Sequence, residues 1–245
     1  MSKAWKISLA VVVVLVVLVG GGIWWFLHDD APAKVSLDTA AQSVTTTTAG
    51  ATGTTASGPV SIDGTWTVDT SSGTFDYQTA TGTFAGFRIK EELSSIGSTT
   101  AVGRTGHVSG TATIAGDTLT AATFDVDTTT FKTNATQRDS RVQIALETGQ
   151  FPTATFTLTQ PVALGADAAA GGDVAVTAVG EFTLHGVTKP VEVPIQARLV
   201  GGTIVLVGSF DITFSDYGVS VPKAPIVVSV ADSGTVEMQI LLTKQ

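Results

Sequence analysis

The fold is decided by the stretch TIVLVGSFDITFS, residues 203–215. Every second position is apolar or glycine: Ile204, Leu206, Gly208, Phe210, Ile212 and Phe214. The positions between them hold Val205, Val207, Ser209, Asp211, Thr213 and Ser215. A period of two is typical of a strand that buries one face. The stretch therefore predicts a half-buried β-strand.

The same alternation recurs on both sides of this stretch. It is found around Trp66 and Val68, Phe75 and Tyr77, Phe87 and Ile89, in 107–114, 119–126 and 154–158, at Phe182 and Leu184, and in 191–199 and 235–242. Glycine and proline separate these segments, and residues 135–146 alone are typical of a short helix. Eight to ten strands with one helix indicate an antiparallel barrel or sandwich.

The N-terminal region, residues 1–30, is typical of a membrane anchor. Residues 7–27 carry no charge, and a helix of that length covers roughly 30 Å, the hydrocarbon thickness of a bilayer. Lys3 and Lys6 precede the run and Asp29 and Asp30 follow it, so the positive-inside rule places the N-terminus in the cytoplasm and the rest outside. We expect a single-pass protein of the cell membrane with an extracytoplasmic domain. A cleaved signal peptide is the alternative, because Ala31-Pro32-Ala33 matches the small-x-small pattern of a cleavage site.

Residues 31–58 are rich in Thr, Ala, Ser and Gly and contain few large apolar side chains. Such a composition does not offset the entropy cost of ordering, so we expect a flexible linker. Residues 59–245 contain all the period-two segments, and we expect them to form one domain.

Composition excludes several classes of protein. The net charge of −8 argues against nucleic-acid binding, because phosphate backbones require a basic surface. The absence of cysteine excludes disulfides, thiolate zinc sites and thiol nucleophiles, and 3 histidines leave little for a metal site. We expect no metal and no cofactor.

Residues 59–245 resemble the YceI-like family. The resemblance rests on these blocks, in this order: 64–69 (GTWTVD), 87–93 (FRIKEEL), 102–105 (VGRT), 108–110 (VSG), 138–139 (RD), 151–156 (FPTATF) and 180–191 (GEFTLHGVTKPV). The resemblance implies a lipocalin-like antiparallel barrel of about eight strands with one short helix, a size that encloses one small ligand. It also implies binding of a polyisoprenoid lipid outside the cytoplasm. Many members carry a histidine just after the first-strand aspartate, whereas here Thr70, Ser71 and Ser72 follow Asp69.

Large aromatic residues at strand positions are the candidates to line a ligand-binding lumen. They are Trp66, Phe75, Tyr77, Phe87, Phe124, Phe131, Phe156, Phe182, Phe210 and Phe214. The alternative for each is ordinary core packing, which is the common role of aromatic residues in a β domain.

Three polar residues are candidates for the barrel mouth. Arg138 offers a guanidinium for a phosphate or carboxylate head, and Asp139 follows it. The alternative is an ion pair that fixes the helix to the barrel rim. His185 offers a donor for a headgroup, or it bonds neighbouring backbone and fixes a turn. Arg104, a further basic residue in an acidic domain, is a candidate for the same role, with a charge on a strand face as its alternative.

Catalysis has little support in the sequence, and we expect a binding protein rather than an enzyme. The chain has no Gly-x-Ser-x-Gly elbow, no phosphate-binding loop and no His-Glu-x-x-His motif. His107 and Ser109 share a strand face without a turn to expose the serine, and Asp125 and Asp127 are typical of a solvated face. The alternative function is a cell-envelope interaction domain with a filled barrel and no ligand.

Overall fold

The structure is a computed structural model that describes residues 31–49, 61–94, 97–221 and 227–245. Within these residues the α-helices are α2 (Leu37–Ala49) and α3 (Thr136–Ala145). The strands are β1 (Gly64–Val68), β2 (Phe84–Leu93), β3 (Gly97–Thr105), β4 (Val108–Ala115), β5 (Thr118–Asp127), β6 (Thr153–Leu158), β7 (Val162–Ala163), β8 (Val174–Leu184), β9 (Val187–Val200), β10 (Thr203–Thr213), β11 (Val227–Val230) and β12 (Ser233–Lys244). Three 3-10 turns are η1 (Thr128–Thr130), η2 (Ala168–Ala170) and η3 (Phe214–Tyr217).

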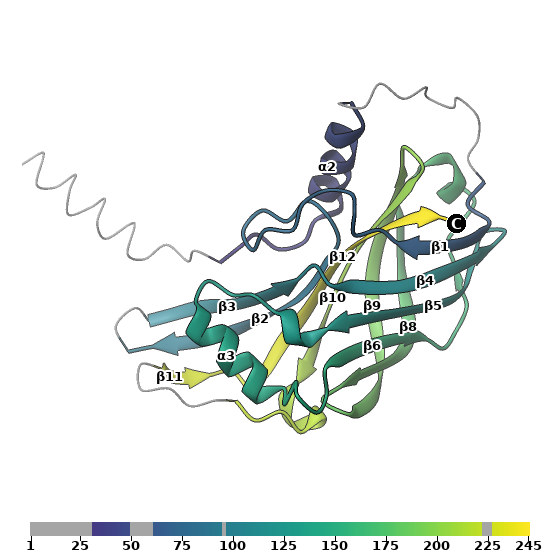
Figure 1. The fold of residues 1–245 in the computed structure, drawn as a ribbon. Coiled ribbons are helices and arrows are strands. Elements are labelled where there is room, and N and C mark those ends of the chain that lie inside the picture. The colour runs from purple at the N-terminus through teal and green to yellow at the C-terminus, as the bar shows by residue number, and fades with distance from the viewer. Residues whose placement is uncertain (1–30, 50–60, 95–96, 222–226) are drawn as a thin grey trace, which may run out of the picture.

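Eight of these strands close into an antiparallel barrel (Figure 1). Their order is β1-β4-β5-β6-β8-β9-β10-β12, and β12 pairs back to β1 through Val68 and Leu242. Closure gives each of these eight strands a neighbour on both sides, which protects its edges from pairing with another chain. The predicted all-β, eight-stranded barrel is therefore confirmed.

Strand β10 corresponds to the stretch that predicted the fold. It pairs with β12 along its whole length, from Thr203 opposite Thr243 to Thr213 opposite Ser233. Its inward side chains Leu206, Phe210 and Ile212 are buried in the barrel core. The period-two pattern thus assigned the inward face correctly.

Strands β2, β3 and β11 extend the sheet beyond the closed ring (Figure 1). One half of β12 pairs with β1, and the other half pairs with β2 through Val236 and Phe87. Strand β3 pairs with β2 along nine positions and was missed in the sequence, because its small residues show no apolar alternation. Phe75 and Tyr77 lie in bends and turns between β1 and β2, so the strand predicted there is wrong.

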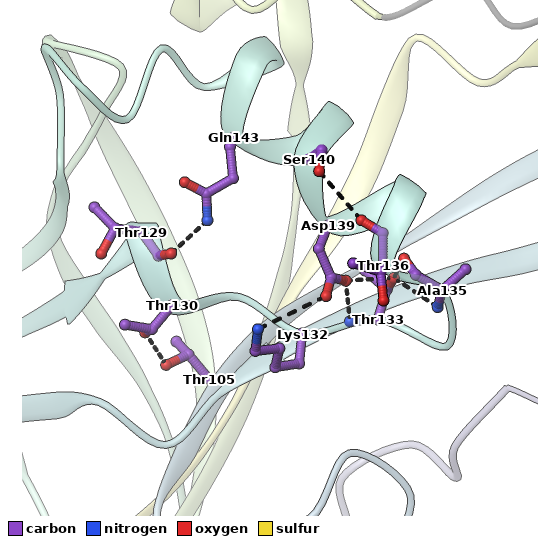
Figure 2. A network of polar contacts seen from close by, with 10 residues as sticks. All are labelled: Thr105, Thr129, Thr130, Lys132, Thr133, Ala135, Thr136, Asp139, Ser140 and Gln143. Atoms are coloured by element: carbon purple, nitrogen blue, oxygen red, sulfur yellow. Dashed lines mark hydrogen bonds and ion pairs between the residues drawn. The ribbon is translucent and has the colours of Figure 1, made fainter.

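Helix α3 confirms the helix predicted near residues 135–146. Polar contacts attach it to the chain segment that precedes it (Figure 2). Asp139 Oδ1 accepts hydrogen bonds from the backbone N–H and the hydroxyl of Thr133, both at 2.7 Å. Its other carboxylate oxygen lies 3.9 Å from Lys132 Nζ, and Gln143 donates to the carbonyl of Thr129. These contacts fix α3 beside η1.

Helix α2 contradicts part of the predicted flexible linker and the prediction of a single helix. It packs outside the barrel against β9 and β10, as Figure 1 shows. Its apolar residues share a buried cluster with outward residues of the barrel: Leu37, Ala40, Val44, Val205, Val207 and Leu241. The outward valines of β10 are therefore buried too. Only the C-terminal half of this strand, residues 209–213, alternates between exposed and buried side chains as predicted.

Arg104, which forms a buried ion pair with Glu237, attaches the residues that precede α2 to the barrel. Arg104 is 3% exposed, and its Nε donates to Glu237 Oε1 at 2.9 Å. Its Nη2 donates to the backbone carbonyl of Ala33 at 2.6 Å. Arg104 thus belongs to the outer face of the barrel and holds the N-terminal segment there, rather than lying at the mouth.

The predicted membrane span, residues 7–27, lies outside the residues that the structure describes. Within the described ranges, no helix has the length and hydropathy needed to cross a membrane.

Candidate functional site

The barrel interior contains a larger and a smaller cavity, stacked along the strands. On β5, Phe124 lines the smaller cavity and Val126 lines the larger one. On β12, Met238 lines the smaller cavity and Val236 lines the larger one. Residues two apart on a strand point to the same face, so the two spaces follow one another inside one lumen.

The larger space, here called the α3 cavity, has a volume of about 210 Å³. Its wall is formed by inward residues of β2, β3, β5, β6, β8, β10, β11 and β12, by residues 219–221, and by one face of α3. The α3 face consists of Arg138, Arg141, Val142 and Ala145. Their spacing of i, i+3, i+4 and i+7 is that of one helical stripe. Arg138 of α3 contacts Glu91 of β2, and Figure 1 shows α3 next to β2 and β11.

The smaller space, here called the β5 cavity, has a volume of about 80 Å³. Its lining is apolar except for Arg198, whose charge is fully paired. Arg198 Nε donates to Asp173 at 2.5 Å, and Nη2 lies 3.0 Å from Asp38 of α2. Hydrogen bonding with Arg198 lowers the pKa of Asp173, and the same bond, with that to Asp38, raises the pKa of Arg198. This cavity offers no unpaired charge to a ligand.

The ten aromatic candidates separate into three groups. Six line a cavity, with Phe124 and Phe156 in the β5 cavity and Phe87, Phe131, Phe182 and Phe214 in the α3 cavity. Trp66 and Phe210 are buried in the core and line neither cavity, which is the packing alternative. Phe75 is 38% exposed and, like Tyr77, lies in the segment between β1 and β2, so the prediction that these two line the lumen is wrong.

Arg138 lies at the wall of the α3 cavity and is also paired. Its Nη2 lies 2.5 Å from Glu91 Oε1 on β2, and its Nη1 donates to Asn134. Glu91 is only 8% exposed, so this pair is largely shielded from water. The structure thus shows the ion pair that fixes the helix to the rim and places Arg138 in the cavity wall, and binding of a headgroup stays a prediction.

Asp139 and His185 line neither cavity. Asp139 is occupied by the Thr133 contacts shown in Figure 2. His185 and Gly186 form the two-residue turn between β8 and β9, and their φ angles of 53° and 73° fit a type I′ hairpin. His185 Nδ1 lies 3.0 Å from the carbonyl oxygen of Tyr217, and its ring meets Phe151 edge to face. For His185 the structure shows the turn-fixing alternative.

The carboxylates considered for catalysis have local partners. Asp125 accepts a hydrogen bond from the hydroxyl of Thr155 at 2.6 Å. Asp127 caps η1 by accepting from the N–H and hydroxyl of Thr129 at 2.9 and 2.6 Å. Asp125 therefore joins β5 to β6, and Asp127 fixes the start of η1.

Arg141 is a cavity residue that the sequence analysis did not single out. It is partly buried, and no hydrogen bond or ion pair joins it to any residue that the structure describes. The available signal was its place three residues after Arg138, which puts both guanidinium groups on the same helical stripe.

Two solved structures share this architecture. One is a polyisoprenoid binding domain from Saccharophagus degradans implicated in plant cell wall breakdown, with a TM-score of 0.55 and 21% identity; the match covers 66% of this chain and 94% of that one. The other is BcnA of Burkholderia cenocepacia, with a TM-score of 0.50 and 18% identity, covering 64% of this chain and 95% of that one. At these identities the likeness establishes the fold alone.

Sequence relatives match a shorter stretch. Protein YceI of Escherichia coli is 40% identical over 78 residues, which are 31% of this chain and 36% of the relative. A UPF0312 protein of Vibrio campbellii is 38% identical over 78 residues, with the same coverage. The chain thus spans about a third of the length of these relatives.

The YceI-like domain family matches residues 32–242. This match includes α2 and nearly all of the barrel. Helix α2, which lies within the predicted linker of residues 31–58, is therefore part of the matched region. Because the match covers most of the chain, the protein belongs to the YceI-like domain family.

Proposed function

We propose that the protein binds an amphiphilic, isoprenoid-like lipid, with the apolar chain of the lipid in the α3 cavity. The observation that carries the proposal is a 210 Å³ space whose wall is almost entirely apolar and whose charged groups are Glu91, Arg138 and Arg141. An apolar wall with a few polar groups on one side is the usual form of a ligand site. The likeness to a polyisoprenoid binding domain supports the same ligand class.

Burial of the chain supplies the binding energy in this account. Each methylene removed from water contributes about 0.8 kcal/mol before the cost of ordering the ligand. The 210 Å³ space admits several such groups, so each further methylene that enters it strengthens binding. Affinity should therefore rise with chain length and depend little on salt.

The protein is, in the same proposal, a binding protein of the cell membrane and not an enzyme. Residues 7–27 would anchor it, with the barrel outside the cytoplasm. Support comes from the uncharged run and the lysines before it. Protease added to intact cells should digest the barrel and leave the N-terminal fragment in the membrane fraction; an N-terminus near Lys34 in the mature protein would contradict the anchor.

Native mass spectrometry of the purified full chain, followed by organic extraction, tests the ligand proposal. We expect a bound species that extracts as an isoprenoid-like lipid. If no lipid extracts, and added farnesol neither binds nor raises the melting temperature, the interaction domain without a ligand becomes the better account.

A further inference from the structure

The charged groups of the α3 cavity do not cancel. Its lining contains one acidic residue, Glu91, and two basic residues, Arg138 and Arg141. Glu91 is paired with Arg138 at 2.5 Å, and the second terminal nitrogen of Arg138 is bound to Asn134. Arg141 has no such partner among the described residues. The cavity wall therefore has one unpaired positive charge.

This unpaired charge is unusual for the molecule. The chain carries a net charge of −8, so acidic groups available to pair with an arginine are plentiful. Arg198, the arginine at the β5 cavity, pairs with both Asp38 and Asp173. Arg141 lies instead on the stripe of α3 that faces apolar residues, where a guanidinium without a partner is partly removed from water at a cost in free energy.

The position of Arg138 is also unfavourable for the helix itself. Arg138 lies in the first turn of α3, where the positive end of the helix dipole disfavours a cation. Arg141 follows on the same side one turn later. The pair with Glu91 compensates the charge of Arg138, whereas Arg141 has no such partner among the described residues; an anion placed between α3 and the cavity would supply one.

We propose that the ligand of the α3 cavity is an anionic amphiphile, with a phosphate or carboxylate head bound by Arg141. This inference rests on the proposed function and specifies its ligand class. The guanidinium group offers a planar pair of donors that matches either head. In this proposal the head lies at α3, and the apolar chain contacts Phe182 and the other apolar residues of the wall. Arg138 already bonds Glu91 and Asn134, so it contributes mainly its charge, and Arg141 supplies the donors that bind the head.

A comparison of two ligands with the same chain tests the proposal. The full chain, kept in a non-ionic detergent, is titrated with farnesyl phosphate, with farnesol and with inorganic phosphate. The variant is Arg141→Gln. The matched control is Lys34→Gln, which removes one positive charge from an exposed residue of the segment before α2 that lines neither cavity.

We expect Arg141→Gln to weaken farnesyl phosphate binding roughly tenfold to a hundredfold and to leave farnesol unchanged, because a charge-assisted hydrogen bond is lost only with the anionic head. Lys34→Gln should leave both affinities unchanged. Inorganic phosphate alone should bind far more weakly than farnesyl phosphate. If inorganic phosphate bound as tightly as farnesyl phosphate, the anionic ligand would be free phosphate and not the head of a lipid, and the proposal would be wrong.

A second variant distinguishes recognition from a structural role. Glu91→Gln removes the acidic partner of Arg138, so farnesyl phosphate should bind roughly threefold to tenfold more tightly while farnesol does not change. If neither Arg141→Gln nor Glu91→Gln alters the ratio of the affinities for farnesyl phosphate and farnesol, the proposal of an anionic head is wrong, while binding of farnesol still supports the proposed function. If farnesol and farnesyl phosphate both fail to bind the unaltered chain, the proposed function itself is wrong.

Discussion

The ring of Phe182 on β8 meets the ring of Phe210 on β10 edge to face, with 5.2 Å between their centroids. Phe182 lines the α3 cavity, whereas Ala178, four residues earlier on the same strand, lines the β5 cavity. Phe210 lies between Leu206, which lines the β5 cavity, and Ile212, which lines the α3 cavity. This aromatic pair therefore stands at the boundary between the two spaces and sets the depth available to a ligand chain.

A smaller side chain at this boundary should join the two spaces. Phe182→Leu removes three carbons, which costs about 2 kcal/mol of folding stability at ~0.8 kcal/mol per carbon. Geranylgeraniol, one isoprene unit longer than farnesol, should then bind relatively better, because its end reaches the β5 cavity. The ratio of the two dissociation constants, measured by titration, reports this change.

Phe84→Leu is the matched control for the loss of stability. Phe84 is buried on the outer side of the barrel beneath the guanidinium of Arg104 and lines neither cavity. It should lower stability without altering the preference for chain length. An unchanged preference in Phe182→Leu as well would show that the pair does not limit the chain.

Helix α2 should contribute to the stability of the barrel. Leu37 is 6% exposed and packs with Val205 and Leu241, so Leu37→Ala should lower the free energy of unfolding by about 2 kcal/mol or more. Thr39→Ala, on the exposed face of the same helix, should have little effect. Urea unfolding of the full chain measures both. Equal stability of the two variants would indicate that the segment is a detached linker.

Asp69 should make stability depend on acid pH. Burial acts to raise the pKa of Asp69, but hydrogen bonds from Ser71 and Ser72 outweigh it and lower the pKa below its ordinary value. A carboxyl group with a lowered pKa stabilises the folded state above its unfolded pKa of about 3.9, and this contribution is lost as the pH falls through the folded pKa. Asp69→Asn should therefore be less stable than the parent at neutral pH, and the difference should narrow below about pH 4. Unfolding curves across this range would contradict the account if the difference stayed constant.

The sequence predicted the barrel well because its signal is local. Period two in residues 203–215 follows directly from the alternation of side chains along a strand, and β10 has that pattern in the structure. Strand β3 lacked this signal, since its inward face is made of small residues that pack against Phe87 and its neighbours. Phe75 and Tyr77 carried the signal without forming a strand, because turns interrupt the chain there.

Helix α2 and the cavity charges depend on contacts between distant residues. Ala-rich and Thr-rich sequence has a composition typical of a linker, and the helix is stabilised by the outward valines of β10, 160 or so residues away. Val205 and Val207 were the one available hint, since an outward face that is apolar needs a cover. The pairing of Arg138 with Glu91, which leaves Arg141 unpaired, likewise joins a helix to a strand far away in the chain.

Binding of farnesol to a chain whose α3 cavity has been filled is the most direct test of the central claim. Ala145 faces this cavity from α3, whereas the adjacent Ile144 is 72% exposed. Ala145→Phe should place a ring in the cavity and weaken farnesol at least tenfold, while Ile144→Phe should bind like the parent, with both variants retaining a cooperative melt. Equal farnesol affinity in the two variants would contradict the account, because the ligand would then lie somewhere other than the α3 cavity.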